Sequence, residues 1–154
     1  MVTIIHLWAF DPGEQTGWCH MSVHEGAVGL FSCGETDHIG VGNLLEDNPA
    51  IRAAGKRKEL EMAFVIERFV MNTKITPQPW SLETIGLVRY FAARYQIPLH
   101  LQGSSEAKTL IKNDVIKRAG LWTPTKDGHA NDSIRHALYY LTVKKGLLKE
   151  CLKP

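Results

Sequence analysis

The pattern of apolar and polar residues predicts strands in the first quarter of the chain. Residues 2–10 form a near-continuous apolar run, which is typical of a strand covered on both faces, and residues 11–13 end it in an Asp-Pro-Gly turn. Residues 16–24 and 27–36 predict two further strands, and Glu25-Gly26 between them predicts a hairpin turn. Together the three segments predict an antiparallel meander.

The centre of the chain predicts helices and strands in alternation. Residues 37–62 are interrupted by glycines and a proline, which predicts one broken helix or two short ones. Residues 63–70 predict a central strand, and residues 97–101 predict a short one. Between these strands the sequence predicts a helix at 81–95, with Ser81 as its N-cap and an apolar stripe that would cover the sheet.

The last third of the chain predicts helices. They are two short helices at 104–111 and 113–119 and a long one at 129–145, with loops expected at 72–79 and 122–128. The order βββαβαβαα predicts one α/β domain over residues 1–154. Its core would be a mixed five-stranded sheet, in which two parallel strands extend the antiparallel meander and helices cover both faces.

Composition places the chain among folded soluble proteins, with 44% hydrophobic and 22% charged residues. No apolar run approaches the length of a membrane span, and the first ten residues lack the basic start of a signal peptide. We therefore expect the cytoplasm as its compartment and no membrane partner. The three cysteines form no C-x-x-C pair, which predicts buried thiols instead of disulfides or a zinc knuckle.

Charge is distributed unevenly along the chain. Residues 1–51 carry seven acidic and no basic side chains, whereas residues 52–154 carry 18 basic and nine acidic ones, so the net charges are −7 and +9. A polyanion would therefore meet the later part of the chain. The candidate contacts are Lys56, Arg57, Lys58, Arg89, Arg94, Lys108, Lys112, Lys117 and Arg118. The simpler interpretation of any one cluster is a solvated helix surface.

Three carboxylates lie at the edges of predicted core elements. Asp11 ends the first strand, Glu67 lies inside the central strand, and Asp132 lies in the final helix. A carboxylate beside a buried strand is costly without a counterion, and Mg²⁺ prefers oxygen ligands. His129, Asp132 and His136 are spaced to share one helix face. If that face meets the end of the first strand, His129 and Asp132 can join Asp11 and Glu67 around metal for phosphoryl transfer.

Each candidate also has a simpler interpretation. Asp11 before Pro-Gly is often only a turn residue, and Asp132 in a first helical turn is favoured by the helix dipole. Glu67 has few inexpensive structural uses in mid-strand. For His136 we favour a packed or supporting histidine over a ligand, and no further Cys or His supports a zinc site with His129 and Asp132. Trp80 and Trp122 near loops can touch DNA, although packing is the default.

Three motifs in order resemble those of RuvC-like Holliday junction resolvases, members of the RNase H-like nuclease superfamily. Residues 10–18 resemble the family's "IDPG…TG" signature, residues 65–69 are similar to its "IE" strand, and residues 129–138 are similar to its final "[DH]-x-x-D-A" helix. The similarity covers essentially the whole chain. Its short length and loose middle look more like a phage-encoded member than a cellular one.

The resemblance implies an RNase H-like fold and a homodimeric endonuclease that nicks opposed strands of four-way or other branched DNA, leaving 5′-phosphate and 3′-hydroxyl ends. It implies two Mg²⁺ or Mn²⁺ ions held by Asp11, Glu67, His129 and Asp132. Lys108 matches a lysine that approaches the scissile phosphate. Phe69 falls one residue before the family's base-stacking aromatic. With Lys108, Lys112, Lys117 and Arg118 it completes the expected DNA contacts, and the helix at 81–95 would dimerise.

His129 stands where many family members have a carboxylate, which removes one negative charge. This would weaken the second metal or let the imidazole act in water activation. Asp127, in the preceding loop, is an alternative source of that charge.

Two rival functions fit the same motifs. One is an RNase H-like nuclease acting on RNA or on unbranched DNA, as in YqgF-like relatives that share an early "D-x-G" strand. The other is a branched-DNA binding module without catalysis. Three carboxylates at a site for a polyanion would repel it without metal, which favours the nuclease.

Overall fold

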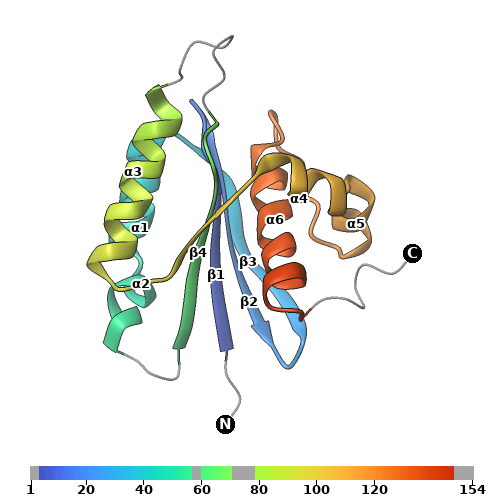
Figure 1. Ribbon diagram of the computed structural model, residues 1–154, viewed down its shortest axis with the longest axis horizontal. Helices are drawn as coiled ribbons and strands as arrows, with labels where there is room; N and C mark the ends of the chain where they lie inside the picture. Colours follow the sequence, from blue (N-terminus) through green and yellow to red (C-terminus); the bar gives the residue numbers. More distant parts are fainter. Residues whose placement is uncertain (1–3, 57–59, 71–78, 148–154) are drawn as a thin grey trace.

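A five-stranded mixed sheet separates two layers of helices in the computed structural model, which describes residues 4–56, 60–70 and 79–147 (Figure 1). The strand order is β3-β2-β1-β4-β5. The strands are β1 (Ile4–Asp11), β2 (Thr16–His24), β3 (Ala27–Thr36), β4 (Leu60–Glu67) and β5 (Leu99–Gln102). The helices are α1 (His38–Asp47), α2 (Pro49–Ala53), α3 (Pro79–Arg94), α4 (Ser104–Leu110), α5 (Asn113–Arg118) and α6 (His129–Tyr139). The predicted α/β class and mixed sheet are confirmed.

The antiparallel meander forms as predicted. β1 pairs with β2, and β2 pairs with β3, in antiparallel register. Glu25 and Gly26 connect β2 to β3 with positive φ angles of 50° and 80°. A two-residue turn with both central residues in the left-handed region matches the right-handed twist of the strands that it joins. The local sequence therefore fixes this hairpin.

The parallel half of the sheet aligns three polar residues at one edge. β1 pairs with β4 and β4 with β5 in parallel, with Phe10 opposite Ile66 and Glu67 opposite Gln102. Asp11 and Glu67 are the next residues of their strands, so both stand where the strands end. β4 begins three residues before the predicted strand and ends at Glu67, because the chain leaves the sheet there.

Each face of the sheet has its own core. α6 packs with α5 on the face that receives alternate residues of β1, among them Leu7 and Ala9. The opposite face, covered by α1, α2 and α3, receives Trp8 and Phe10 (Figure 1). Since side chains alternate along a strand, Asp11 belongs to the α6 face. The final helix and the carboxylate are thus on the same side of the sheet.

The apolar stripe of α3 covers the sheet, as predicted. Ile85, Val88 and Phe91 are buried in the second core. The prediction that Ser81 is the N-cap is wrong, because α3 begins at Pro79 and the Ser81 hydroxyl donates to the Pro12 carbonyl at 3.1 Å. That bond ties the start of α3 to the turn after β1.

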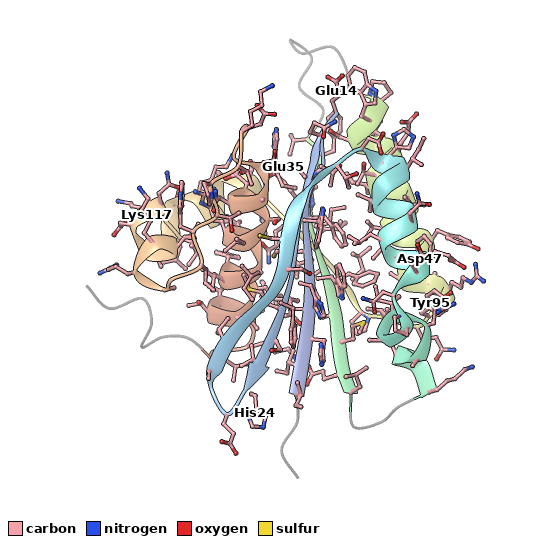
Figure 2. All side chains as sticks on the ribbon, turned by 180° about the vertical axis from the view of Figure 1, so that it is seen from behind. Glu14, His24, Glu35, Asp47, Tyr95 and Lys117 are labelled. Carbon is pink, nitrogen blue, oxygen red and sulfur yellow. The ribbon has the colours of Figure 1, made fainter. Side chains whose placement is uncertain are left out.

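The N-terminus of α6 lies directly on β2. A Cβ atom at Gly17 would lie 1.9 Å from the His129 carbonyl oxygen, so only glycine permits this approach. Glu35, at the end of β3, accepts a hydrogen bond from the Ala130 amide at 3.2 Å and so replaces the missing side-chain cap of α6 (Figure 2). Because Gly17 is the register partner of Asp11, His129 arrives beside that carboxylate.

The remaining predictions differ mainly at element ends. The predicted helix at 129–145 is α-helical to Tyr139 and continues as a π-helix over Tyr140–Lys144. Within the segment at 37–62, residues 38–56 form α1, α2 and a short 3₁₀ turn, so the two-helix alternative is confirmed, and residues 60–62 already belong to β4. Cys19 is buried as expected and Cys33 is partly buried, while Cys151 and most of the predicted loop at 72–79 lie outside the described residues. In the described ranges, no helix combines the length and apolarity that a membrane span requires.

Candidate active site

Three residues from three elements converge at the carboxyl edge of the parallel strands. Asp11 ends β1, Glu67 ends β4, and His136 comes from α6; one possible ligand atom of each lies within 4.8 Å of the other two. The strand ends place the two carboxylates side by side, and α6 covers them with its polar face. Asp11, Glu67 and His136 therefore form the candidate metal-binding cluster of the described residues.

Asp11 is a buried carboxylate held by His129. It is 8% exposed, and the His129 Nδ1 atom lies 2.9 Å from its Oδ2 atom. Burial raises the pKa of Asp11 above its ordinary value, and the neighbouring Glu67 adds to the rise, while the His129 hydrogen bond opposes it. The surroundings of Asp11 therefore do not fully compensate the negative charge of its ionised form.

Glu67 is bound by a second histidine. The Nε2 atom of His136 lies 2.9 Å from Glu67 Oε2, and its Nδ1 atom lies 3.0 Å from Gln102 Oε1. Burial raises the pKa of Glu67, but the His136 hydrogen bond and the charges of His136 and Lys108 outweigh burial, so the net shift is downward. The environments of Asp11 and Glu67 thus push their pKa values apart.

The contacts of His136 constrain its protonation. His136 is fully buried, and as the Gln102 amide is oriented both its ring nitrogens face oxygen atoms, so each contact needs a ring N–H. A half-turn of the Gln102 amide would instead offer a donor to Nδ1 and allow a neutral ring. Within the described residues the Gln102 Nε2 atom has no hydrogen-bond partner, so it is available for that rotation. In both arrangements His136 donates to Glu67.

Asp132 lies beside the cluster and is neutralised from two sides. Its Oδ1 atom accepts from Arg135, and its Oδ2 atom lies 3.4 Å from Lys108 Nζ. Arg135 is 7% exposed and also donates from Nε to the Ile111 carbonyl at 2.7 Å and from Nη2 to Asn113. In the described part of the chain, Asp132 is not one of the residues whose ligand atoms converge with Asp11.

The predicted DNA contacts fall into two groups. Lys108 and Lys112 line a cavity next to Asp132, and Lys117 lies with its Nζ atom 4.7 Å from the centre of the Trp122 ring. Arg118 pairs with Asp114 at 3.4 Å. Phe69 stands apart from these basic residues, because it is partly buried against the core under α3. Figure 2 shows Lys117 on the far side of α5 from the sheet.

Sequence reasoning predicted Asp11, Glu67, His129 and Asp132 as one ligand set. The fold brings Asp11 and Glu67 together and places His129 against Asp11, whereas Asp132 pairs with Arg135 and Lys108 beside them. Sequence reasoning left His136 outside the candidate set, although its spacing from Asp132 already placed it on the same helix face. Gln102 and Arg135 were missed altogether. Nothing in the local sequence marks Gln102, because His136 lies 34 residues away. For Arg135 the spacing from Asp132 on the same helix was a usable signal, although Ile111 lies 24 residues away.

The cluster fits a divalent cation. Asp11 and Glu67 supply carboxylate oxygens, the ligands that Mg²⁺ and Mn²⁺ prefer, and the buried Asp11 has a raised pKa that a cation would lower. His129 and His136 already donate to these oxygens, so a bound ion would share or displace those hydrogen bonds. Asp127 lines the cavity beside Asp132 and does not join the cluster that the structure describes.

Comparison with known proteins relates the chain to solved structures. No protein-family model and no curated protein matches it. The structure of Thermus thermophilus RuvC superimposes with a TM-score of 0.62 at 14% identity, covering 94% of this chain and 98% of that one. The complex of T. thermophilus RuvC with a Holliday junction substrate gives a TM-score of 0.58 at 14% identity, with 94% and 97% covered. The chain therefore has the RuvC-like form of the RNase H-like fold.

Proposed function

We propose that this protein is a metal-dependent endonuclease that cuts branched DNA, with four-way junctions as its substrate. The observation that carries the proposal is the placement of Asp11 and Glu67 at the same edge of a RuvC-like sheet, with oxygen atoms close enough to share a cation. Carboxylates at that position can hold divalent cations, and those cations offset the negative charge that a phosphate substrate brings to the site.

Asp11, Glu67, His129 and Asp132 would hold two Mg²⁺ or Mn²⁺ ions. When bound, these ions supply an activated water and stabilise the leaving oxygen of the cut phosphodiester. Asp132 is oriented for this purpose by Arg135, whose guanidinium is itself fixed by the Ile111 carbonyl. Second-sphere contacts of this kind fix the geometry of ligands and tune their affinity for metal.

The basic residues of the site have separate tasks. Lys108 lies 3.4 Å from Asp132, and its charge reaches Glu67, so it is placed to stabilise negative charge on the phosphate. The Nδ1 atom of His129 faces Asp11 and holds that carboxylate. The other ring nitrogen of His129 is the one that would accept a proton from water. His136 orients Glu67 by the hydrogen bond to its Oε2 atom. His129 and His136 already contact Asp11 and Glu67, and Lys108 contacts Asp132 beside them.

DNA binding would extend over the helices that carry the basic residues. Lys112, Lys117 and Arg118 would contact the backbone, and Phe69 would contact a base if it leaves its packed position. Symmetric nicks on opposed strands need two active sites, so we propose a homodimer. An enzyme of DNA recombination with this substrate would work in the cytoplasm, or in the cytoplasm of a host if it is phage-encoded.

A binding module without catalysis is the second candidate. Each carboxylate has a basic neighbour: Asp11 has His129, Glu67 has His136, and Asp132 has Arg135 and Lys108. The repulsion that these acids would exert on DNA without metal is therefore smaller than the sequence suggests. Binding of branched DNA by the metal-free protein is compatible with these contacts.

A cleavage assay decides between the candidates. Labelled four-way, three-way, flap, linear duplex and RNA–DNA hybrid substrates are incubated with Mg²⁺, Mn²⁺ or EDTA, and wild type is compared with Glu67→Gln. The control is Glu61→Gln, near the other end of β4, where Glu61 pairs with Lys145. We expect paired nicks in the four-way junction, lost in Glu67→Gln and kept in Glu61→Gln. Cutting of the hybrid alone would indicate the RNase H-like alternative, and binding without cutting would indicate the module.

A further inference from the structure

A cavity of about 460 Å³ opens beside Asp132, between α4, α5 and the start of α6. Its volume falls within the range of pockets that bind small molecules or single nucleotides, roughly 300–1,000 Å³. Asp132 and Lys108 line this cavity, and Lys108 also acts on Glu67. A ligand in the cavity could therefore be part of the same DNA strand that reaches Asp11 and Glu67.

The charges of the cavity suit a phosphate. Three basic side chains, Lys108, Lys112 and Arg135, line it together with two acidic ones, Asp127 and Asp132. Arg135 is already committed to Ile111, Asn113 and Asp132, and Lys108 is paired with Asp132. Lys112 therefore stands out as the side chain for an incoming backbone phosphate. Lysines of this kind contact backbone phosphates without reading the base.

An aromatic residue completes the lining. Trp122 lines the cavity and is 38% exposed, so the expectation that it is packed is only partly met. Lys117 lies over its ring at 4.7 Å, which occupies one face of the indole. The exposed part of the ring that lines the cavity can receive a planar group. Stacking on an aromatic side chain is the usual way in which proteins hold a base that has left its duplex.

The loop that carries Trp122 is fixed in place. Asn131 on α6 accepts from the Thr123 amide at 3.0 Å and donates to the Thr123 carbonyl at 2.6 Å. Cys33 on β3 contacts the Thr123 hydroxyl at 3.2 Å. Trp122 therefore stands next to a residue that three hydrogen bonds hold to the body of the domain. A preorganised ring loses little entropy when a base stacks on it.

We infer that this cavity binds one unpaired nucleotide of the cut strand, with its base stacked on Trp122 and its phosphate on Lys112. The inference rests on the proposed function for the path of the DNA, and it deepens that function by naming the substrate class. A base cannot stack on Trp122 and stay inside a duplex at the same time. The enzyme would then select DNA in which a nucleotide beside the cut is unpaired or easily extruded, as at a junction centre.

A double-mutant cycle between protein and DNA tests the contact. Four-way junctions carry a single abasic site at each position within three nucleotides of the cut, and their affinities are measured for wild type and Trp122→Ala in Ca²⁺. We expect Trp122→Ala to weaken binding of the intact junction by about tenfold, from the usual strength of base–aromatic stacking. The substitution should have no effect when the one position that occupies the cavity is abasic.

Three further proteins control this cycle. Trp122→Phe keeps a stacking ring and should retain most of the affinity. Trp80→Ala removes a tryptophan of similar exposure, 39%, that does not line the cavity, and should bind as wild type does. Lys112→Ala should lower the slope of log affinity against log salt by about one, as expected for the loss of one phosphate contact.

A titration of fluorescein-labelled tetrathymidylate, followed by anisotropy, separates this inference from the proposed function, since it requires neither a junction nor cutting. Binding that weakens about tenfold in Trp122→Ala and survives in Trp122→Phe would support the cavity even if no substrate were cut. If junctions are cut but Trp122→Ala matches wild type in both the cycle and the titration, the nucleotide site is wrong and the nuclease stands. An equal loss at every abasic position would likewise overturn the site.

Discussion

His136 Nε2 lies 2.9 Å from Glu67 Oε2, and no part of the His136 side chain is exposed. His136 on α6 thus contacts Glu67 at the end of β4 and fixes one of its carboxylate oxygens. Gln102 Oε1 holds the other ring nitrogen at 3.0 Å, so the imidazole cannot turn freely. The orientation of Glu67 depends on a residue 69 positions later in the chain.

We expect His136→Ala to raise the Mg²⁺ concentration for half-maximal cleavage by about 10–100-fold, because supporting hydrogen bonds to metal ligands have effects of this size. His136→Gln keeps a donor toward Glu67 and should recover part of the loss. The measurement is cleavage rate against Mg²⁺ concentration for folded protein. The control is His24→Ala at the exposed β2–β3 hairpin. An unchanged Mg²⁺ requirement in His136→Ala would show that the contact is only structural.

Asp11 gives a prediction that needs no cleavage. Burial raises its pKa, so its ionised form destabilises the metal-free fold, and Asp11→Asn should stabilise the metal-free protein by about 1 kcal/mol at pH 7. Wild type should instead gain ~1.4 kcal/mol at a tenfold excess of Mg²⁺ over its Kd, which raises Tm by about 4 °C.

Thermal unfolding of both proteins, with and without Mg²⁺, measures these effects. The control is Asp47→Asn at the end of α1, on the other face of the sheet (Figure 2). It should respond to Mg²⁺ as wild type does. An equal rise of Tm in Asp11→Asn would place the bound ion elsewhere.

The sheet could be predicted from the sequence because its information is local. The β2–β3 hairpin follows from Glu25-Gly26, and the two strands that it joins have the predicted ends. The end of the β4 strand was harder, since the apolar residues Phe69 and Val70 follow Glu67 and Arg68. β4 ends where its parallel partners β1 and β5 end. Tertiary pairing sets this end, so the sequence of β4 alone does not predict it.

The site was predictable only in part, for the same reason. Asp11 and Glu67 stand out because carboxylates are rare at the ends of buried strands. His136 was expected to be a packed or supporting histidine, and its hydrogen bonds fit the supporting role. Only the register of β4 and β5 reveals that its two nitrogens meet Glu67 and Gln102. Arg135 was not among the candidates. Its spacing from Asp132 is a local signal, but its contacts with Ile111 and Asn113 come from segments whose position the sequence does not disclose.

Gly17 tests how closely α6 must approach β2. A Cβ atom at this position would meet the His129 carbonyl oxygen at 1.9 Å, and backbone cannot move aside as a flexible side chain can. We expect Gly17→Ala to destabilise the fold by about 3 kcal/mol and to weaken Mg²⁺ binding, because His129 would leave Asp11. Gly29→Ala in β3, where the new Cβ lies 3.4 Å from the Ser22 hydroxyl, is the matched control. Urea unfolding compares the two, and equal stabilities would mean that α6 adjusts without cost.

His20 predicts how stability depends on pH. Burial, with a smaller effect of His6, lowers the pKa of His20 to about 4, so the imidazole is neutral in the folded protein while an unfolded chain binds a proton near pH 6.5. The unfolded state therefore takes up the proton first, and the stability is complete above pH 6.5 and falls as the pH drops towards 4. After discounting for partial exposure, the loss is on the order of 2 kcal/mol.

Urea unfolding of wild type and His20→Phe at pH 7 and pH 4.5 measures this term. Phenylalanine can keep the stacking that His20 makes with Trp8, at 4.4 Å between ring centres, but it cannot bind a proton. The variant should therefore lose about 2 kcal/mol less than wild type between the two pH values. His24→Phe replaces the exposed histidine of the same strand and should follow the wild-type pH dependence. If His20→Phe does so too, acid destabilisation comes from other groups, and the packing of His20 against Trp8 imposes no penalty on its charged form.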